Sequence, residues 1–484
     1  MALAASGGLF LLAACVFVLF IAWLAPALVV PVLALIAGAI LLWGAWAGVP
    51  MLRKLLGQLR WWHALWAALF LSDLTFRIRT AEALVENPLD PWGMYRVALV
   101  GIVAATLLFR LAVKATNTLK VLSSGPVGWL VVFALLNLVS AAWSVYPAWT
   151  VYKSLEFLTD VALLAAIVAT VRSSREFKTI LDWTWVLYGS LVLVVWGGLL
   201  VWPAQALEHN SGLLGVSLAG AMPAVASNTV GRMAAVLGIV ALTRIARSTA
   251  RRGFYAVAFL LSLATLIFAQ SRGPFAGFLA ALAVTLIAMR RWGILTAIAL
   301  AVLAVLLSPG PRDAAWQFVL RGEDQEMFQS LSGRTDWWSY AWERFREHPL
   351  EGYGGYAGPR FAVLAKIGWS TTASLHNTWL EVLLSTGVLG LVPLLAAVLA
   401  VCAPLWRSRS CAVHENESGR LWLEAAGVLT VLLVTTIFNT ELIYHPPLFF
   451  LVVVGYAQRL RGRSPELVCE DPARPFSHGL SVGY

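Results

Sequence analysis

The sequence predicts an all-α polytopic membrane protein, and three observations support this fold class. The 484-residue chain is 60% hydrophobic and only 12% charged, with a mean hydropathy of +0.78, which is far more apolar surface than a soluble domain needs. Apolar runs of about 17 to 25 residues recur from end to end, and each can cross roughly 30 Å of hydrocarbon as a helix. Lysine and arginine gather in alternate connections between these runs.

The apolar runs give the number of spans. About 14 runs have their centres at about positions 16, 37, 68, 103, 135, 161, 192, 238, 262, 281, 300, 391, 430 and 452. The signal for a span is weaker in two places. The third run carries His63 and Asp73, and only residues 290–293 separate the runs at 281 and 300. Losing a pair of spans would not flip the chain ends, so we expect about 12 to 14 transmembrane helices.

Basic residues predict the orientation. With the N-terminus in the cytoplasm, roughly 22 of the 35 lysines and arginines fall in cytoplasmic connections, and each of these connections holds at least two. We therefore expect an inner-membrane protein with both termini cytoplasmic. These connections also account for most of the net charge of +10 and the pI of about 9.7, so we expect no nucleic-acid partner. No cysteine falls in an outside connection, and no disulfide is expected.

One outside connection is much longer than the others. We expect residues 1–308 to form a bundle of about 11 spans, residues 377–460 about three more, and residues 461–484 a disordered cytoplasmic tail. Residues 309–376 lie between the two groups of spans. A connection of that length usually carries function, so it is predicted to be a periplasmic catalytic loop.

The centre of this loop reads SGRTDWWSYAWERFREHPLEGYGGYAG. Four apolar residues recur there at helical spacing: Trp338, Ala341, Trp342 and Phe345. They predict an amphipathic helix on the membrane surface or over the bundle mouth, capped by Ser332 or Thr335 and ended by Pro349. A glycine-rich turn with Tyr353 and Tyr356 follows, where backbone can approach a ligand closely. Packing alone accounts for the tryptophans equally well.

The loop closes with TTASLHNTWLEVLLSTGVLGL, which passes directly into a transmembrane helix. His376 and Asn377 therefore lie at the outer membrane boundary, with Glu381 one turn deeper. A histidine at an interface can simply be solvated. Glu381 favours a functional reading, because an ionisable residue inside a membrane helix is a candidate site residue.

Three cations face the same boundary. Arg272 begins a span, Arg232 lies one turn inside another, and Lys153 follows the segment WSVYPAWTVY. Several outward cations at the lipid surface suit a pyrophosphate head group. Snorkelling to lipid phosphates is the alternative, and it fits Lys153 better than Arg232.

These segments resemble the O-antigen ligase and polymerase superfamily of bacterial membrane glycosyltransferases. Four pieces match its pattern in order: WSVYPAWTVYKS, the Ser271-Arg272-Gly273 turn, SGRTDWW to HPLEGYG, and HNTWLEVLLSTGVLG. SNTVGRMAAVLGIVAL also resembles the Asn-x-x-Gly-Arg stretch of the polymerase branch, although Ala226 and Ser227 replace the lysine and histidine often found before that asparagine. A polymerase is slightly favoured over a ligase.

The resemblance implies metal-independent, cofactor-free and inverting transfer of a glycan from undecaprenyl diphosphate to a saccharide or lipid A core hydroxyl, at the periplasmic face and beside membrane lipid. In this hypothesis Arg272, Arg232 and Arg334 stabilise the diphosphate and His376 accepts the proton of the acceptor. The remaining candidates are assigned to substrate binding or to orienting His376: Lys153, Asn377, Tyr353, Tyr356 and Glu381.

A lipid-linked oligosaccharide flippase or secondary transporter is the rival from another class. Such a protein should show internal repeats or ionisable groups near the membrane midplane. No clear repeat is visible, and the charged candidates crowd one membrane face beside the long loop. That asymmetry favours catalysis over alternating access.

Overall fold

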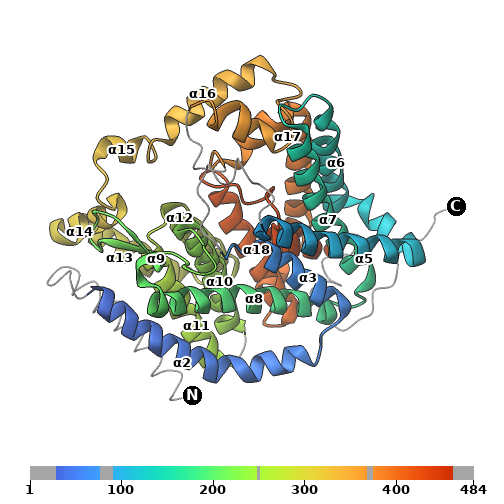
Figure 1. Cartoon of the computed structure of the whole chain (residues 1–484). Helices are drawn as coiled ribbons and strands as arrows, with labels where there is room; N and C mark the ends of the chain where they lie inside the picture. Colours follow the sequence, from blue (N-terminus) through green and yellow to red (C-terminus); the bar gives the residue numbers. More distant parts are fainter. Residues whose placement is uncertain (1–28, 77–90, 248–250, 368–373, 462–484) are drawn as a thin grey trace.

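The computed structural model describes residues 29–76, 91–247, 251–367 and 374–461 (Figure 1). The described chain is almost entirely helical, and its only sheet pairs β1 (Leu207–His209) with β2 (Val216–Leu218) in antiparallel register. The predicted all-α polytopic class is confirmed.

Seventeen α-helices make up the described part: α2 (Val29–Leu56), α3 (Trp61–Ser72), α5 (Pro91–Leu122), α6 (Gly125–Val139), α7 (Pro147–Thr170), α8 (Ser174–Val201), α9 (Pro203–Ala206), α10 (Ser227–Arg247), α11 (Arg252–Ala269), α12 (Arg272–Ala288), α13 (Trp292–Leu307), α14 (Pro309–Leu320), α15 (Gln325–Gln329), α16 (Arg334–Glu347), α17 (Thr378–Arg407), α18 (Glu417–Thr435) and α19 (Leu448–Leu460). Short turns of other helix types are η2 (Ser140–Ala142), η3 (Gly358–Leu364) and η4 (Arg409–Val413).

Eight described helices are long and apolar enough to cross a membrane, and α13 with α14, bent by 98°, would make a ninth. The other predicted runs inside the described residues are also helical, but they are either too short or too charged to be counted with these eight. α3, α12 and α19 are short, and α7 carries Lys153, Glu156 and Asp160. The run predicted near position 16 lies outside the described residues.

The core of the bundle is formed by α10, α18 and α19. α10 packs against α11, α12 and α18, while α19 contacts α17, α18 and α7. Nearly every residue of α19 is buried, so this short helix is enclosed on all sides by other helices. Charges inside the core are paired: Arg244 donates to Glu424 at 2.8 Å and to Asp182 at 2.7 Å.

The two ends of the bundle differ in chemistry. At one end, the connections predicted to be cytoplasmic contact each other: Arg247 pairs with Glu415 at 3.7 Å, and Lys178 pairs with Glu417 at 3.7 Å. The opposite end carries the start of α10, α12 and α17, and the segment from α14 to the start of α16 lies against the start of α12. In Figure 1, α14 to α16 run from the left edge of the view to its top. The candidate site residues that begin these helices are therefore at one end.

The predicted amphipathic helix is α16, but its cap and one residue of its buried face differ from the prediction. Gly333, in a left-handed conformation with φ 78°, is the N-cap, instead of Ser332 or Thr335. Ala341 is buried and Trp338 and Phe345 are partly buried, as predicted, but Trp342 is 44% exposed and Trp337 is buried instead. The reason is that α16 packs on η3 and α17 of its own chain, so tertiary contacts select the buried side.

α17 is broken near its first third, at Thr386 and Gly387, where the backbone leaves the helical region. Four backbone hydrogen bonds join α17, on the two sides of this break, to residues 349–354 of the loop: Tyr353 N to Leu384 O (2.8 Å), Gly354 N to Ser385 O (2.8 Å), Val388 N to Pro349 O (2.9 Å) and Leu389 N to Leu350 O (3.2 Å). The loop therefore takes up the backbone groups that the break leaves without helical partners.

One expectation about the cysteines is wrong. Cys411, buried in η4, is disulfide-bonded, whereas no disulfide was predicted, because no cysteine falls in an outside connection. Cys402 in α17 is free.

Candidate functional site

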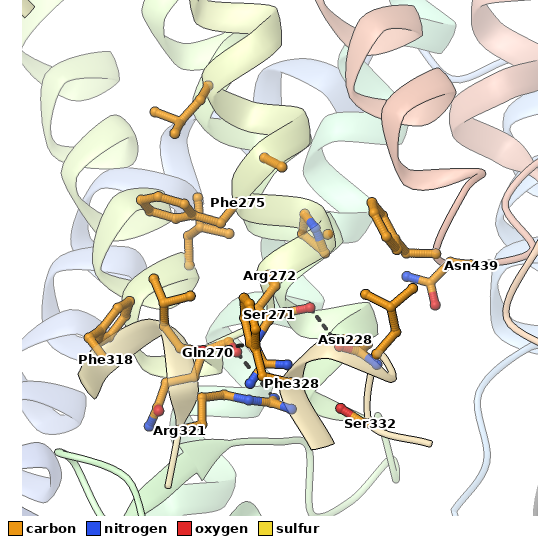
Figure 2. A pocket seen from close by; sticks show the side chains of 18 of the residues that line it. Asn228, Gln270, Ser271, Arg272, Phe275, Phe318, Arg321, Phe328, Ser332 and Asn439 are labelled. Carbon is orange, nitrogen blue, oxygen red and sulfur yellow. Dashed lines mark hydrogen bonds between the residues drawn. The ribbon is translucent and has the colours of Figure 1, made fainter. Parts of the chain in front are cut away.

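A cavity of about 370 Å³ lies at the end of the bundle where α10, α12 and α17 begin (Figure 2). The start of α12, the segment from α14 to the start of α16, and the turn after α18 line it. Its wall is partly aromatic, from Phe275, Phe318 and Phe328, and three arginines reach it: Arg272, Arg321 and Arg334. Such a cavity suits a ligand with both an apolar part and an anionic part.

Arg272 is the first residue of α12 and is fixed by its surroundings. Its guanidinium donates to the carbonyls of Val319 and Leu320, at 2.7 and 2.8 Å, and to the carboxylate of Glu323 at 2.8 Å. It also lies 4.8 Å from the centre of the Phe328 ring. These contacts hold the guanidinium in one orientation at the cavity wall.

Glu323 is the carboxylate that the arginines share. It accepts hydrogen bonds from Arg272, from Arg321 at 3.1 Å and from Ser332 at 3.0 Å. Burial alone would raise the pKa of Glu323, but these hydrogen bonds outweigh burial and hold the pKa below its usual value. Burial, and then the charges of Arg321 and Arg272, lower the pKa of Arg334. Three guanidinium groups around one carboxylate leave the cavity with an excess of positive charge.

His376 lies beside this cavity, in a left-handed conformation with φ 54° just before α17. Its Nδ1 is 3.3 Å from Oδ1 of Asn439, which lines the cavity. Burial lowers the pKa of His376 to about 4, and the positive charge of Arg334 acts in the same direction. The imidazole is therefore neutral near pH 7 and able to accept a proton.

Two other predicted residues hold the backbone around His376. Glu381 is buried and accepts hydrogen bonds from the amide of Leu375 and from the hydroxyl of Tyr444 (2.7 Å). Asn377 is the N-cap of α17, and its side chain accepts from two backbone amides of the first turn. Neither side chain lines the cavity, and their hydrogen bonds fix the backbone just before and just after His376.

Arg232 does not join the other arginines. It forms an ion pair with Glu441 and lines a second cavity, of about 320 Å³, on the other side of the turn after α18. Asp73 and His445 also line this second cavity. The structure therefore separates Arg232 from Arg272 and Arg334, although all three were predicted to bind one diphosphate.

Lys153 and the two tyrosines lie away from the first cavity. Lys153 is buried and donates to Glu156 at 2.7 Å, which also binds Arg96 at 2.6 Å. Tyr353 donates to the carbonyl of Arg344 and to Glu347. Tyr356 donates to the carbonyl of Ile443 at 3.2 Å. All these side chains therefore have protein partners, and none lines either cavity.

Arg321, Glu323 and Asn439 were not among the predicted site residues. Arg321 and Glu323 follow α14 in a stretch without helical periodicity, and Asn439 belongs to the segment FNTELIYHPP. A signal was present in both places, since polar residues at the ends of apolar helices at one membrane face are candidates for a shared site. Among the described residues, no group of three or more histidine, cysteine or acidic side chains could hold a metal ion.

Comparison with known proteins finds a family match over the region that holds most of the candidate site residues. Residues 257–395 match the family model described as O-Antigen ligase, and this range holds Arg272, Arg334, His376 and Glu381. A search of curated proteins found no match. The resemblance noted in the sequence is confirmed. Over residues 257–395 the chain is therefore similar to the O-antigen ligase family.

Proposed function

We propose that this protein transfers a glycan from undecaprenyl diphosphate to a hydroxyl of a saccharide acceptor. The observation that carries the proposal is the cavity lined mostly by residues of the matched range, where Arg272, Arg321 and Arg334 lie and beside which the neutral imidazole of His376 is placed. The aromatic wall would contact the isoprenyl chain, and the arginines would bind the diphosphate. Polymerisation of O-antigen or exopolysaccharide is favoured over ligation to lipid A core, because of the Asn-x-x-Gly-Arg stretch that begins α10.

The proposed reaction is a direct displacement at the anomeric carbon. The acceptor oxygen forms the new glycosidic bond, the bond between that carbon and the diphosphate breaks, and undecaprenyl diphosphate leaves with the bonding electrons. His376 takes the proton of the acceptor hydroxyl. The three arginines stabilise the charge that develops on the leaving group, so this chain needs no metal ion for that role. Displacement from the opposite side inverts the anomeric centre.

Glycan chain length in cells tests this function. Cells that lack the protein should accumulate single repeat units on lipid if it is a polymerase, and full-length chains on undecaprenyl diphosphate if it is a ligase. Complementation with the wild-type protein should restore the normal pattern on a gel. If neither chain length nor attachment changes, the glycosyltransferase proposal fails and transport of lipid-linked glycan becomes the better hypothesis.

The pH dependence of transfer tests the link between Arg334 and His376. With a pKa of about 4, His376 is deprotonated above that pH, so kcat/KM should fall only as the pH drops towards 4. Arg334→Gln removes a nearby positive charge, so the pKa of His376 should rise, though not past 6.5 because burial remains. The acid limb of the kcat/KM profile should move to higher pH. An unchanged limb in this variant would contradict the coupling.

The proposed setting is the bacterial inner membrane, with both termini in the cytoplasm and the site in the periplasm. Labelling of single cysteines with a membrane-impermeant maleimide in intact spheroplasts tests it, in a chain without its native cysteines. Ser339→Cys, exposed on α16, should react, and Glu415→Cys, exposed at the other end of the bundle, should react only after lysis. The opposite pattern would invert the topology and overturn the periplasmic site.

A further inference from the structure

The second cavity differs from the first in its chemistry. It lies between the end of α3, α8, the start of α10 and the segment that leads into α19. Its volume of about 320 Å³ is within the range of roughly 300–1,000 Å³ typical of small-ligand pockets. Polar side chains line it from several elements: Asp73, Thr229, Arg232, Thr440, Glu441 and His445. Its charges are mainly acidic, whereas those of the first cavity are mainly basic.

Glu441 and Arg232 point to a missing polar ligand. The Glu441 side chain is only 2% exposed, and one of its oxygens binds Arg232. The other oxygen, Oε1, and Nε of Arg232 are buried and have no hydrogen-bond partner among the described residues. Buried polar atoms are rarely left unpaired in proteins, and a carboxylate oxygen is satisfied by a donor such as a hydroxyl.

His445 is held rigidly at the same cavity. Its Nδ1 lies 2.7 Å from the buried carboxylate of Asp160, and its Nε2 lies 2.9 Å from the hydroxyl of Ser72. Tyr188 and Phe449 form an aromatic wall, with ring centres 4.0 Å apart. Fixed polar groups beside aromatic faces suit a neutral ligand that has hydroxyls on its edge and apolar C–H faces.

The turn of residues 439–441 lies between the two cavities. Asn439 lines the first cavity and Glu441, two residues further along, lines the second. Thr378 ties this turn together, because its hydroxyl donates to Asn439 O at 2.7 Å and accepts from Glu441 N at 3.2 Å. Ser374 lines the second cavity and accepts a hydrogen bond from the His376 amide at 3.3 Å. A ligand in the second cavity would therefore lie next to His376.

We propose that the second cavity binds the acceptor sugar, a neutral saccharide ring whose hydroxyls donate to Glu441; the inference rests on the proposed glycosyl transfer. Two carboxylates, Asp73 and Glu441, line this cavity with one arginine, Arg232, which is already paired with Glu441, and this charge balance disfavours a diphosphate there. Arg232 is then a residue of the acceptor site, which it shapes by orienting Glu441. The saccharide comes either from the end of a lipid-linked glycan or from lipid A core.

A matched pair of cavity-filling variants tests this assignment. Ala226 lines the second cavity and Ala276 the first, and both are exposed, so phenylalanine at either position fills one cavity without removing a hydrogen bond. The full chain is reconstituted in lipid nanodiscs. Three probes are titrated: undecaprenyl diphosphate without sugar, the repeat-unit oligosaccharide released by mild acid from lipid-linked glycan, and core oligosaccharide released from lipid A.

Ala226→Phe should weaken oligosaccharide binding by about tenfold or more and change undecaprenyl diphosphate binding by less than about twofold. Ala276→Phe should do the reverse. The oligosaccharide that the wild-type protein binds identifies the source of the acceptor. Glu441→Gln, which keeps a hydrogen bond to Arg232 but loses the carboxylate, should also weaken binding of that oligosaccharide. This second variant keeps the proposal testable if Ala226→Phe does not fold.

Three results would overturn the acceptor site: no binding of either oligosaccharide to the wild type, unchanged oligosaccharide binding in Ala226→Phe and Glu441→Gln, or loss of undecaprenyl diphosphate binding in Ala226→Phe. Failure of the proposed function looks different, because the wild-type protein would then fail to bind undecaprenyl diphosphate and glycan length in cells would not depend on it.

Discussion

His376→Ala is expected to reduce glycan transfer by about 10²- to 10⁴-fold, the usual contribution of a general base. The neutral imidazole beside the arginine cavity is the only group next to that cavity that we assign to proton transfer. The measurement is single-turnover transfer from a purified lipid-linked donor. Because the change removes no arginine, binding of undecaprenyl diphosphate should remain within about threefold of the wild type.

His348→Ala is the matched control for this prediction. His348 follows α16 in the same region of the chain, is exposed, pairs with Glu351 at 2.9 Å and packs edge-on against the ring of Tyr353, away from the arginine cavity, so its loss should leave transfer unchanged. Added imidazole should restore part of the activity of His376→Ala, since a small base can occupy the space left by the side chain. Wild-type transfer rates in His376→Ala would remove this residue from the mechanism.

Arg272→Ala should reduce transfer by about 10²- to 10³-fold and also weaken donor binding, because it removes a donor aimed at the leaving group. Arg272→Lys should recover only part of the loss. A lysine keeps the charge but cannot bind Val319 O, Leu320 O and Glu323 at once as the guanidinium does. Transfer and undecaprenyl diphosphate binding are measured together with thermal unfolding.

The control for Arg272 is Arg312→Ala in α14. Arg312 is exposed, pairs with its neighbour Asp313 at 3.1 Å and does not line the cavity. Its loss should change neither transfer nor binding. If Arg272→Ala unfolds at the wild-type temperature and still binds and transfers normally, the arginine cavity is not the diphosphate site.

The helical bundle could be predicted from the sequence because hydrophobic length is a strong local signal. Every predicted run within the described residues has a helix at its centre, including α7 despite Lys153, Glu156 and Asp160. Long-range packing could not be predicted in the same way. Ala341, Trp338 and Phe345 of the predicted face of α16 do pack inward, but Trp337 rather than Trp342 completes the buried side, which only contact with α17 and η3 decides.

The candidate site was predictable in part for a similar reason. His376, Arg272 and Arg334 lie near the ends of helices or beside turns at one face, where polar residues among apolar ones stand out. Their grouping depends on tertiary structure. Arg232 has the same sequence signature as Arg272, yet it pairs with Glu441 and faces another cavity. Sequence position gave no means of separating the two arginines.

The break in α17 determines which parts of this protein can be exchanged between relatives. The loop before His376 supplies the hydrogen bonds that a continuous helix would supply to itself, and Gly387 lies so close to Leu350 that a side chain there would collide with its backbone. A chimera that takes only residues 309–376 from another protein would place foreign backbone against this break. The transplantable unit should therefore extend past the break, and the family match, which ends at residue 395, does so.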